Sequence, residues 1–146
     1  MQYHHTQSGW IVITAILLAV VFLAFSNISI GISGPGQNIG LLILVAALGL
    51  FYSLTVEIKD GVLNCRFGPG IIRRRFLLSD IEDAQCVRNP WYAGWGIRWR
   101  PGRYVLWNIA GLQAVELVLK NGNRFRIGTD EPEAVVRAIR TNKTLQ

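Results

Sequence analysis

The sequence predicts a membrane α-helical hairpin followed by an all-β domain that is capped by one C-terminal helix. Residues 1–56 contain no lysine, arginine, aspartate or glutamate, so all 15 basic and all 9 acidic residues lie from Glu57 onward. Beyond Glu57, short segments in which apolar and polar residues alternate are separated by glycine-containing turns, a pattern typical of antiparallel strands. We therefore divide the chain into an N-terminal tail (1–9), a two-span transmembrane hairpin (10–56) and a β domain with a C-terminal helix (57–146).

Two apolar runs define the hairpin. Trp10–Ile30 is uncharged throughout, so a helix there has no face suited to water. At 1.5 Å per residue such a helix is about 30 Å long, the thickness of a bilayer core. Ile39–Leu54 is shorter and spans the membrane if it extends to Val56 or the bilayer thins locally. Between the runs, the segment Gly31–Asn38 contains three glycines and a proline and is expected to form a turn.

Small residues four positions apart suggest how the two spans pack. Ala15 and Ala19 lie in the first span, and Gly49 and Ser53 lie in the second. Small side chains let two helix backbones approach each other, so these four residues are candidate packing positions. The alternative is that small residues are simply common in membrane helices.

The charge distribution also predicts orientation. Because every lysine and arginine follows the second span, the positive-inside rule places the β domain in the cytoplasm. With two spans the N-terminus is cytoplasmic as well, and the expected location is the inner (plasma) membrane. Cys65 and Cys86 should then be reduced thiols, and neither has the spacing of a metal site.

The β domain should contain six or seven strands. Asp60-Gly61 and Asn121-Gly122 predict hairpin turns. The terminal helix should begin with Asp130 as its cap, complemented by Glu133, and should bury one apolar stripe before a frayed end at 141–146. The expected strands are one ending near Ile58, followed by Val62–Phe67, Ile71–Leu77, Ile81–Val87, a segment through Trp95 and Trp99, one over Val115–Leu119 and one over Phe125–Ile127.

The stretches "GPGIIRRRFLLSDI", "GWGIR", "AVELVLKNG" and "IGTDEPE" resemble those of small bacterial membrane proteins that carry a bacterial pleckstrin-homology-like (PH-like) domain. The resemblance covers about Leu54 to Arg140. It implies a PH-like, partly open barrel closed by the C-terminal helix. It also implies an interaction or assembly module, as a homo-oligomer or as an accessory subunit of a larger membrane complex. The alternative is a domain that senses anionic lipid while tethered by two spans.

Residue types needed for catalysis are sparse, so we expect no enzyme, no cofactor and no metal. The only histidines are His4 and His5, in the N-terminal tail, and no phosphate-binding loop motif is present. A cluster formed by Asp80, Glu82 and Asp83 is best explained as a polar turn before a strand, with a divalent-cation site as the weaker alternative.

Arg73, Arg74 and Arg75 form the most basic segment. In a strand Arg74 points away from the other two, so the three arginines cannot make one patch. We leave three interpretations open: a solvated strand, a contact with anionic lipid head groups, or a contact with a protein partner. Nucleic acid is not an expected partner, because positive-inside topology already explains the net charge of +6.

Four of the five tryptophans lie between Asn89 and Trp107. If residues 95–99 form a strand, Trp95, Ile97 and Trp99 share one face, which we expect to close the core. The core does not explain the aromatic residues that follow Pro90. We therefore predict a docking surface near the membrane, because tryptophan and arginine are enriched both in interface hot spots and at head groups. Its residues are Trp91, Tyr92, Arg98, Arg100 and Arg103.

Overall fold

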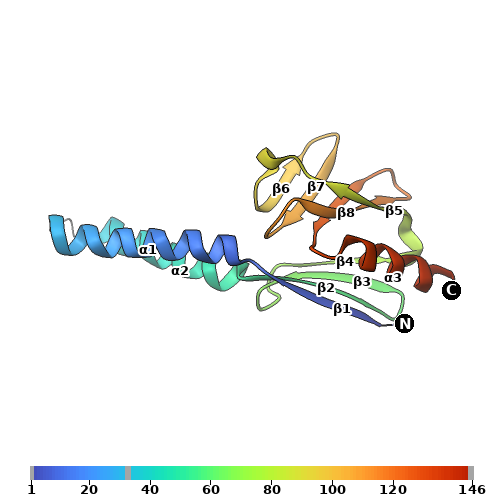
Figure 1. Ribbon diagram of the computed structural model, residues 1–146, viewed down its shortest axis with the longest axis horizontal. Coiled ribbons are helices and arrows are strands. Elements are labelled where there is room, and N and C mark those ends of the chain that lie inside the picture. Colours follow the sequence, from blue (N-terminus) through green and yellow to red (C-terminus); the bar gives the residue numbers. More distant parts are fainter. Residues whose placement is uncertain (1, 32–33, 145–146) are drawn as a thin grey trace.

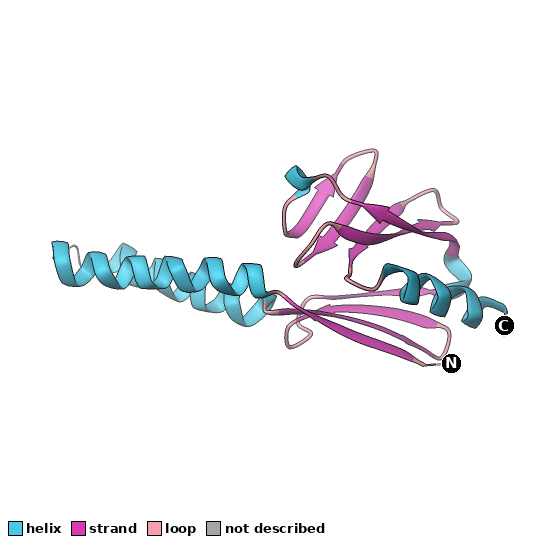
Figure 2. Ribbon diagram, viewed as in Figure 1, coloured by secondary structure: helices cyan, strands magenta, loops and turns pink. Residues whose placement is uncertain are grey.

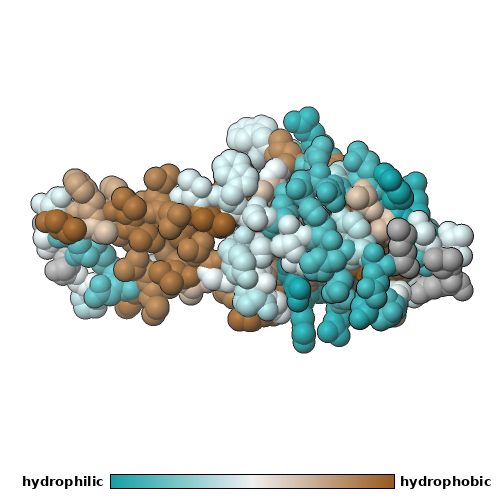
Figure 3. All heavy atoms as spheres, turned by 60° about the horizontal axis from the view of Figure 1, so that its bottom comes forward, coloured by the Kyte–Doolittle hydropathy of each residue, from teal (hydrophilic) through white to brown (hydrophobic). Residues whose placement is uncertain are grey.

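The computed structural model describes residues 2–31 and 34–144 and shows a helical hairpin that projects from one end of a two-sheet domain (Figure 1). Helices α1 (Trp10–Ile30) and α2 (Pro35–Phe51) lie side by side. Their apolar side chains, including Leu18, Phe22 and Leu42, are exposed. Figure 3 shows this hairpin as a hydrophobic rod beside a hydrophilic face of the domain.

Within the described residues, α1 is the one helix that is long and apolar enough to cross a membrane. Its 20-residue window Trp10–Ser29 has a mean hydropathy of 2.7 and buries nothing inside the protein. The second helix is apolar too, but with 17 residues it is only about 26 Å long. Pro35 stands in its first turn, so the helix starts earlier than the expected boundary at Ile39. Residues 32 and 33 of the expected turn lie outside the described residues.

The expected extension of the second span to Val56 is wrong. Strand β2 (Ser53–Lys59) begins two residues after α2 ends. Leu54, Val56 and Ile58 are fully buried in the domain, and they alternate with residues on the opposite face of the strand. These side chains contribute to the β-domain core and cannot also face lipid, so the helical hairpin covers residues 10–51 and not 10–56.

The N-terminal tail contains a strand that the sequence did not predict. Strand β1 (Tyr3–Ser8) pairs antiparallel with β2, from Tyr3 opposite Ile58 to Ser8 opposite Ser53. The two arms of the helical hairpin therefore continue into two paired strands. Polar residues such as His4 and Thr6 gave no local strand signal, and their conformation depends on pairing with β2.

The first sheet has the strand order β1-β2-β3-β4 and is antiparallel throughout. Strands β2 and β3 (Val62–Phe67) are joined by Asp60-Gly61, where both residues have positive φ, at 50° and 75°. That geometry confirms the predicted hairpin turn. Strand β4 (Arg73–Leu77) is the free edge and connects through a short 3₁₀ turn, η1 (Leu78–Asp80), to the second sheet.

The second sheet has the order β5-β8-β9-β7-β6. Its strands are antiparallel neighbours except for β7 and β9, which run parallel. The sequence did not predict β7, which pairs with β6 across a turn at Pro101-Gly102; proline followed by a glycine with φ of 70° is typical of a type II turn. The strands are β5 (Ile81–Arg88), β6 (Gly96–Arg100), β7 (Tyr104–Asn108), β8 (Gln113–Leu119) and β9 (Arg124–Gly128).

Helix α3 (Pro132–Thr144) packs beside β5 and β8 and buries Val135, Val136 and Ile139 (Figure 2). It starts at Pro132, so Asp130 is not its cap; Thr129 Oγ1 instead accepts a hydrogen bond from the Glu131 N–H. The expected frayed end is helical to Thr144, where the Lys143 ammonium donates to the Ile81 and Glu82 carbonyls; residues 145 and 146 lie outside the described residues. Together the two sheets and α3 form an open sandwich and not a closed barrel, since β4 and β6 pair with no strand beyond their single neighbours within the described residues.

The tryptophan that fills the core is not one of the two that were expected to do so. Trp107 is 6% exposed, whereas Trp95 is 42% and Trp99 is 75% exposed. The predicted two-residue period holds for Ile97 and Trp99, which pair with Trp107 and Val105 and share their face of the sheet, whereas Trp95 precedes β6. However, β6 is the outermost strand, so its side chains lie at the rim of the core and not inside it.

Candidate interaction surfaces

The predicted docking residues lie on η2, a 3₁₀ turn over Trp91–Ala93, and on the β6–β7 hairpin. Figure 2 shows η2 at the end of the second sheet nearest the helical hairpin. Trp91 is 81% and Tyr92 62% exposed, and their rings meet edge to face with centroids 6.0 Å apart. We call the set Trp91, Tyr92, Arg98, Arg100 and Arg103 the aromatic–arginine surface.

Arginine and tyrosine side chains alternate along the outer face of the second sheet. The Arg100 guanidinium lies 5.3 Å from the Tyr92 ring centre and 5.9 Å from that of Tyr104. On the other side, Arg126 lies 3.8 Å from the Tyr104 ring centre. Such cation–π contacts hold the guanidinium groups in place while leaving them able to bind anions. The structure thus brings Tyr92 and Arg100 together, whereas Arg103 is exposed in the turn.

A buried ion pair supports this face. Glu116 is 2% exposed and accepts a hydrogen bond from Arg126 Nε at 2.6 Å, with Arg124 at 3.4 Å and Gln85 at 3.2 Å. Arg126 also donates to Asn89 Oδ1 at 3.2 Å. Alternation along Val115–Leu119 places Glu116 on the face opposite the apolar side chains and does not indicate that it is buried. Glu116 is buried because the segment after β5 folds across this face of the sheet, where Asn89 contacts Arg126. The alternation of apolar and polar residues does not predict that fold.

Hydrogen bonds to the backbone fix that covering segment at both ends. The Asn89 N–H donates to the Leu112 carbonyl at 2.7 Å, and Asn108 Nδ2 donates to the Gly94 and Gly111 carbonyls at 3.4 and 3.1 Å. Within the segment, Ala93 is buried, whereas Trp91 and Tyr92 are exposed. Trp91 and Tyr92 are therefore presented on a segment held at both ends, and their exposure is a feature of the fold.

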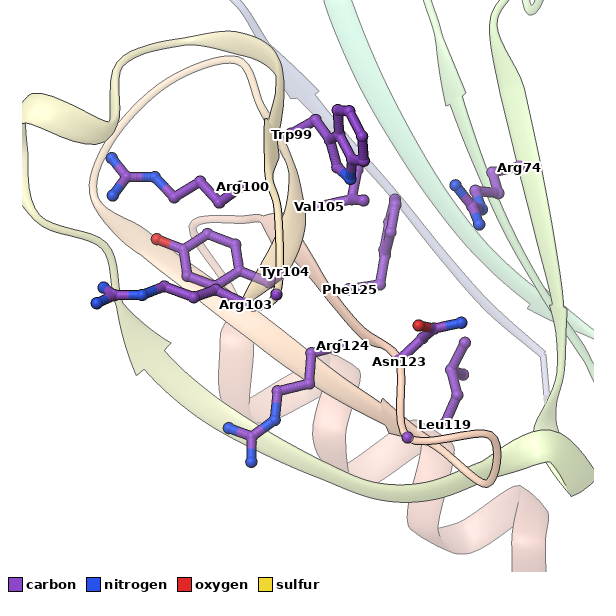
Figure 4. Close-up of a pocket in the computed structure, with 12 residues that line it drawn as sticks. Arg74, Trp99, Arg100, Arg103, Tyr104, Val105, Leu119, Asn123, Arg124 and Phe125 are labelled. Atoms are coloured by element: carbon purple, nitrogen blue, oxygen red, sulfur yellow. The ribbon is translucent and has the colours of Figure 1, made fainter.

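A second feature is an opening of about 440 Å³ between β4 and the end of the second sheet that carries the β6–β7 and β8–β9 turns (Figure 4). Trp99, Val105 and Phe125 point into it from the second sheet, and Arg74 faces them from β4. Arg100 and Arg124 also border the opening, but Figure 4 shows their side chains turned to the opposite face of the sheet. Apolar side chains and the Arg74 guanidinium thus face each other across the opening, with further polar residues at its border, and we call it the inter-sheet opening.

The three consecutive arginines divide as expected. Arg74 is on the inner face, 5.1 Å from the Phe125 ring centre and 5.5 Å from that of Phe76. Arg73 and Arg75 are on the outer face of the first sheet, where Arg73 stands directly opposite Arg66. Like charges placed opposite each other across two strands destabilise a sheet, so this pair favours an anion nearby. A hollow of about 520 Å³ is lined in part by Arg66, Arg73 and Arg75.

The predicted span-packing set is not brought together. Ser53 is the first residue of β2, and a Cβ added at Gly49 would meet nothing within 4 Å, so neither lies at a close contact between helices. Ala15 and Ala19 are both in α1. A polar contact links the helices instead, because Gln37 Nε2 in α2 donates to the Leu23 carbonyl at 2.8 Å.

The junction between hairpin and domain is tightly built. Gly9, between β1 and α1, donates its N–H to the Tyr52 carbonyl at 2.8 Å, and a Cβ there would collide with Ile109. In the β3–β4 turn, Gly68 has a φ of 45° and packs on the last carbonyls of α2, at Gly49 and Leu50. Both sheets therefore touch the base of the hairpin.

His5 and the acidic residues that precede α3 make structural contacts. His5 Nε2 lies 2.7 Å from Asp130 Oδ1, and the Tyr3 hydroxyl donates to Glu131 at 3.4 Å, which ties β1 to the start of α3. Burial and the nearby Glu131 carboxylate raise the pKa of Tyr3 to about 12. Burial also raises the pKa of the Cys65 thiol, which keeps it protonated and inert. No group of three potential metal-ligating side chains occurs within residues 2–31 and 34–144.

Comparison with known proteins assigns the chain to no family. No protein-family model matches the chain, and no curated protein matches it.

Proposed function

We propose that the protein is a non-enzymatic, membrane-anchored docking module. In this proposal both α1 and α2 cross the inner membrane, both termini are cytoplasmic, and the β domain is a PH-like domain held against the head groups. The aromatic–arginine surface binds a protein partner within a membrane complex. No cofactor or nucleic acid is involved.

The observation that carries the proposal is the placement of Trp91 and Tyr92. Both rings are exposed, both belong to a segment fixed by hydrogen bonds to the sheet, and both lie at the end of the domain from which the hairpin projects. Solvent-facing aromatics bring no gain in folding stability, so their exposure favours binding. Arg100, stacked on Tyr92, adds the residue type that most often accompanies aromatics in hot spots.

The anchor is supported by the junction. Because β1 and β2 continue the two helices, a hairpin embedded in lipid fixes the domain close to the membrane surface. Trp10 and Tyr52, at the base of the hairpin, are 65% and 44% exposed and suit the interfacial layer, where amphipathic rings reside.

One observation favours the lipid-sensing alternative. Arg66 and Arg73 oppose each other on the outer face of the first sheet, beside the β3–β4 turn that packs on the end of α2. Two guanidinium groups at that level would pair well with phosphate head groups. Arg73 and Arg75 then contribute to membrane contact, while Arg74, on the inner face, does not.

Site-specific photocrosslinking in membranes tests the proposal. A photoreactive residue at Trp91 should form one discrete protein adduct, whereas the same residue at Lys120, in the β8–β9 turn at the other end of the sheet, should form none. A photoreactive residue at Arg73 tests the alternative. Protein adducts from Trp91 support docking. Adducts only to lipid, or adducts of equal yield from Trp91 and Lys120, would contradict it.

A further inference from the structure

The free edge of β6 carries a pattern that specifies a ligand. Toward the core, Ile97 and Trp99 are 41% and 75% exposed, so this face offers uncovered apolar area, and Trp99 borders the inter-sheet opening. Toward the outside, the strand carries Arg98 and Arg100. Within the described residues β6 pairs only with β7, which leaves its other backbone edge unpaired. An exposed strand edge is a template for adding another strand.

We propose that β6 binds an extended segment of a partner protein in which apolar and acidic residues alternate. Directly opposed residues in an antiparallel pair share a face of the sheet. A strand added to β6 would therefore place one set of side chains against Ile97 and Trp99 and the other set against Arg98 and Arg100. The first set must be apolar and the second acidic. This inference rests on the proposed docking function and names the chemistry of its partner.

Charges around the opening agree with this ligand. None of the residues that line the opening is acidic. Arg74 faces it across from Trp99 and makes cation–π contacts with Phe76 and Phe125, but no hydrogen bond or ion pair within the described residues. An apolar side chain of the bound segment would cover the exposed ring of Trp99 on this inner face, while its acidic side chains would meet Arg98 and Arg100 on the outer face.

A second copy of the chain is a poorer occupant. If β6 of one copy paired with β6 of another, with both cores on the same side of the joined sheet, arginine would stand opposite arginine on the outer face. Like charges in that position destabilise the pair. The arginines thus disfavour self-pairing, and they favour an acidic partner through the same charge.

Two labelled peptides test the proposal against the full chain in detergent micelles. One has alternating valine and glutamate, and the other alternating valine and lysine, each with the same polar flanks. Fluorescence anisotropy should show binding of the valine–glutamate peptide and weaker binding of the other. The double substitution Arg98→Glu/Arg100→Glu should weaken binding of the valine–glutamate peptide by about tenfold or more and strengthen binding of the valine–lysine peptide.

The matched control is Arg73→Glu/Arg75→Glu, which changes the net charge equally on the other sheet and should leave both affinities within about twofold. Trp99→Ser should weaken binding of the valine–glutamate peptide without reversing the preference for glutamate over lysine. This variant keeps the proposal testable if Arg98→Glu/Arg100→Glu does not fold. Absence of valine–glutamate binding, equal loss in the control, or a crosslink from β6 to β6 between copies would overturn the proposal. If Trp91 crosslinks to a protein while the peptide fails, this inference falls and the docking function stands.

Discussion

Phe51, the last residue of α2, packs edge-on against Phe67 of β3, with ring centroids 5.2 Å apart. From Phe67 the ring contacts continue to Trp107 at 5.1 Å, to Phe125 at 5.6 Å and to Phe76 at 4.8 Å. This aromatic column runs from the base of the helical hairpin to the floor of the inter-sheet opening. The proposed anchor and the proposed binding edge are therefore joined through one core.

Substituting two tryptophans should separate core from surface. Trp107→Ala removes a buried ring from the aromatic column and should lower the free energy of unfolding by about 3–5 kcal/mol. Trp99→Ala removes a ring that is 75% exposed and should cost less than about 1 kcal/mol. Denaturant unfolding of the full chain in detergent measures both. Equal losses would mean that β6 is part of the core, as the sequence first suggested.

Removing Glu116 should destabilise the second sheet. Without this carboxylate, the largely buried Arg126 guanidinium loses its closest partner, so Glu116→Ala should cost about 3 kcal/mol or more. The control Glu82→Ala removes an exposed carboxylate that makes no side-chain contact within the described residues, and it should be nearly neutral. A neutral Glu116→Ala would contradict the covering role of the segment after β5.

Two glycines should respond oppositely to substitution. Gly68→Ala adds a Cβ within 2.7 Å of the Leu50 carbonyl oxygen at a φ of 45°, so it should lower the melting temperature clearly. Gly49→Leu, in open space on α2, should leave it unchanged in detergent. The reverse order would restore Gly49 to the helix contact and would place the β3–β4 turn away from α2.

Cysteine labelling tests topology. In a background of Cys65→Ala and Cys86→Ser, an impermeant maleimide applied to intact cells should label Asn38→Cys, near the start of α2. It should label Lys120→Cys, in the β8–β9 turn, only after lysis. Labelling of Lys120→Cys in intact cells would reverse the orientation. Labelling of neither variant before lysis would contradict two crossings.

The parts of the fold that follow local patterns were predictable. The apolar α1, the Asp60-Gly61 turn, the alternation of Arg73, Arg74 and Arg75 and the buried stripe of α3 each depend on neighbours in the sequence. The strand β1 was not predictable in this way, because its residues are polar and acquire their conformation only by pairing with β2. The end of α2 was misjudged for a related reason: Leu54 and Val56 are as apolar as a membrane span, and only the β pairing decides their conformation.

The candidate surfaces were half predictable. Composition around Pro90 indicated that Trp91 and Tyr92 lie outside the core, and both rings are exposed. The period of two placed Ile97 and Trp99 on one face, but periodicity cannot tell an edge strand from a central one. The stacking of Arg100 between Tyr92 and Tyr104 depends on β7, which the break at Pro101-Gly102 concealed.

The most direct test of the docking function is the double substitution Trp91→Ser/Tyr92→Ser in the full chain. Because both rings are exposed, the melting temperature should stay within about 2 °C of the wild type. After extraction in mild detergent, the wild-type chain should migrate on a native gel with its partner, and the double variant should migrate free of it. A variant that still migrates with the partner, or that unfolds as Trp107→Ala does, would contradict the account.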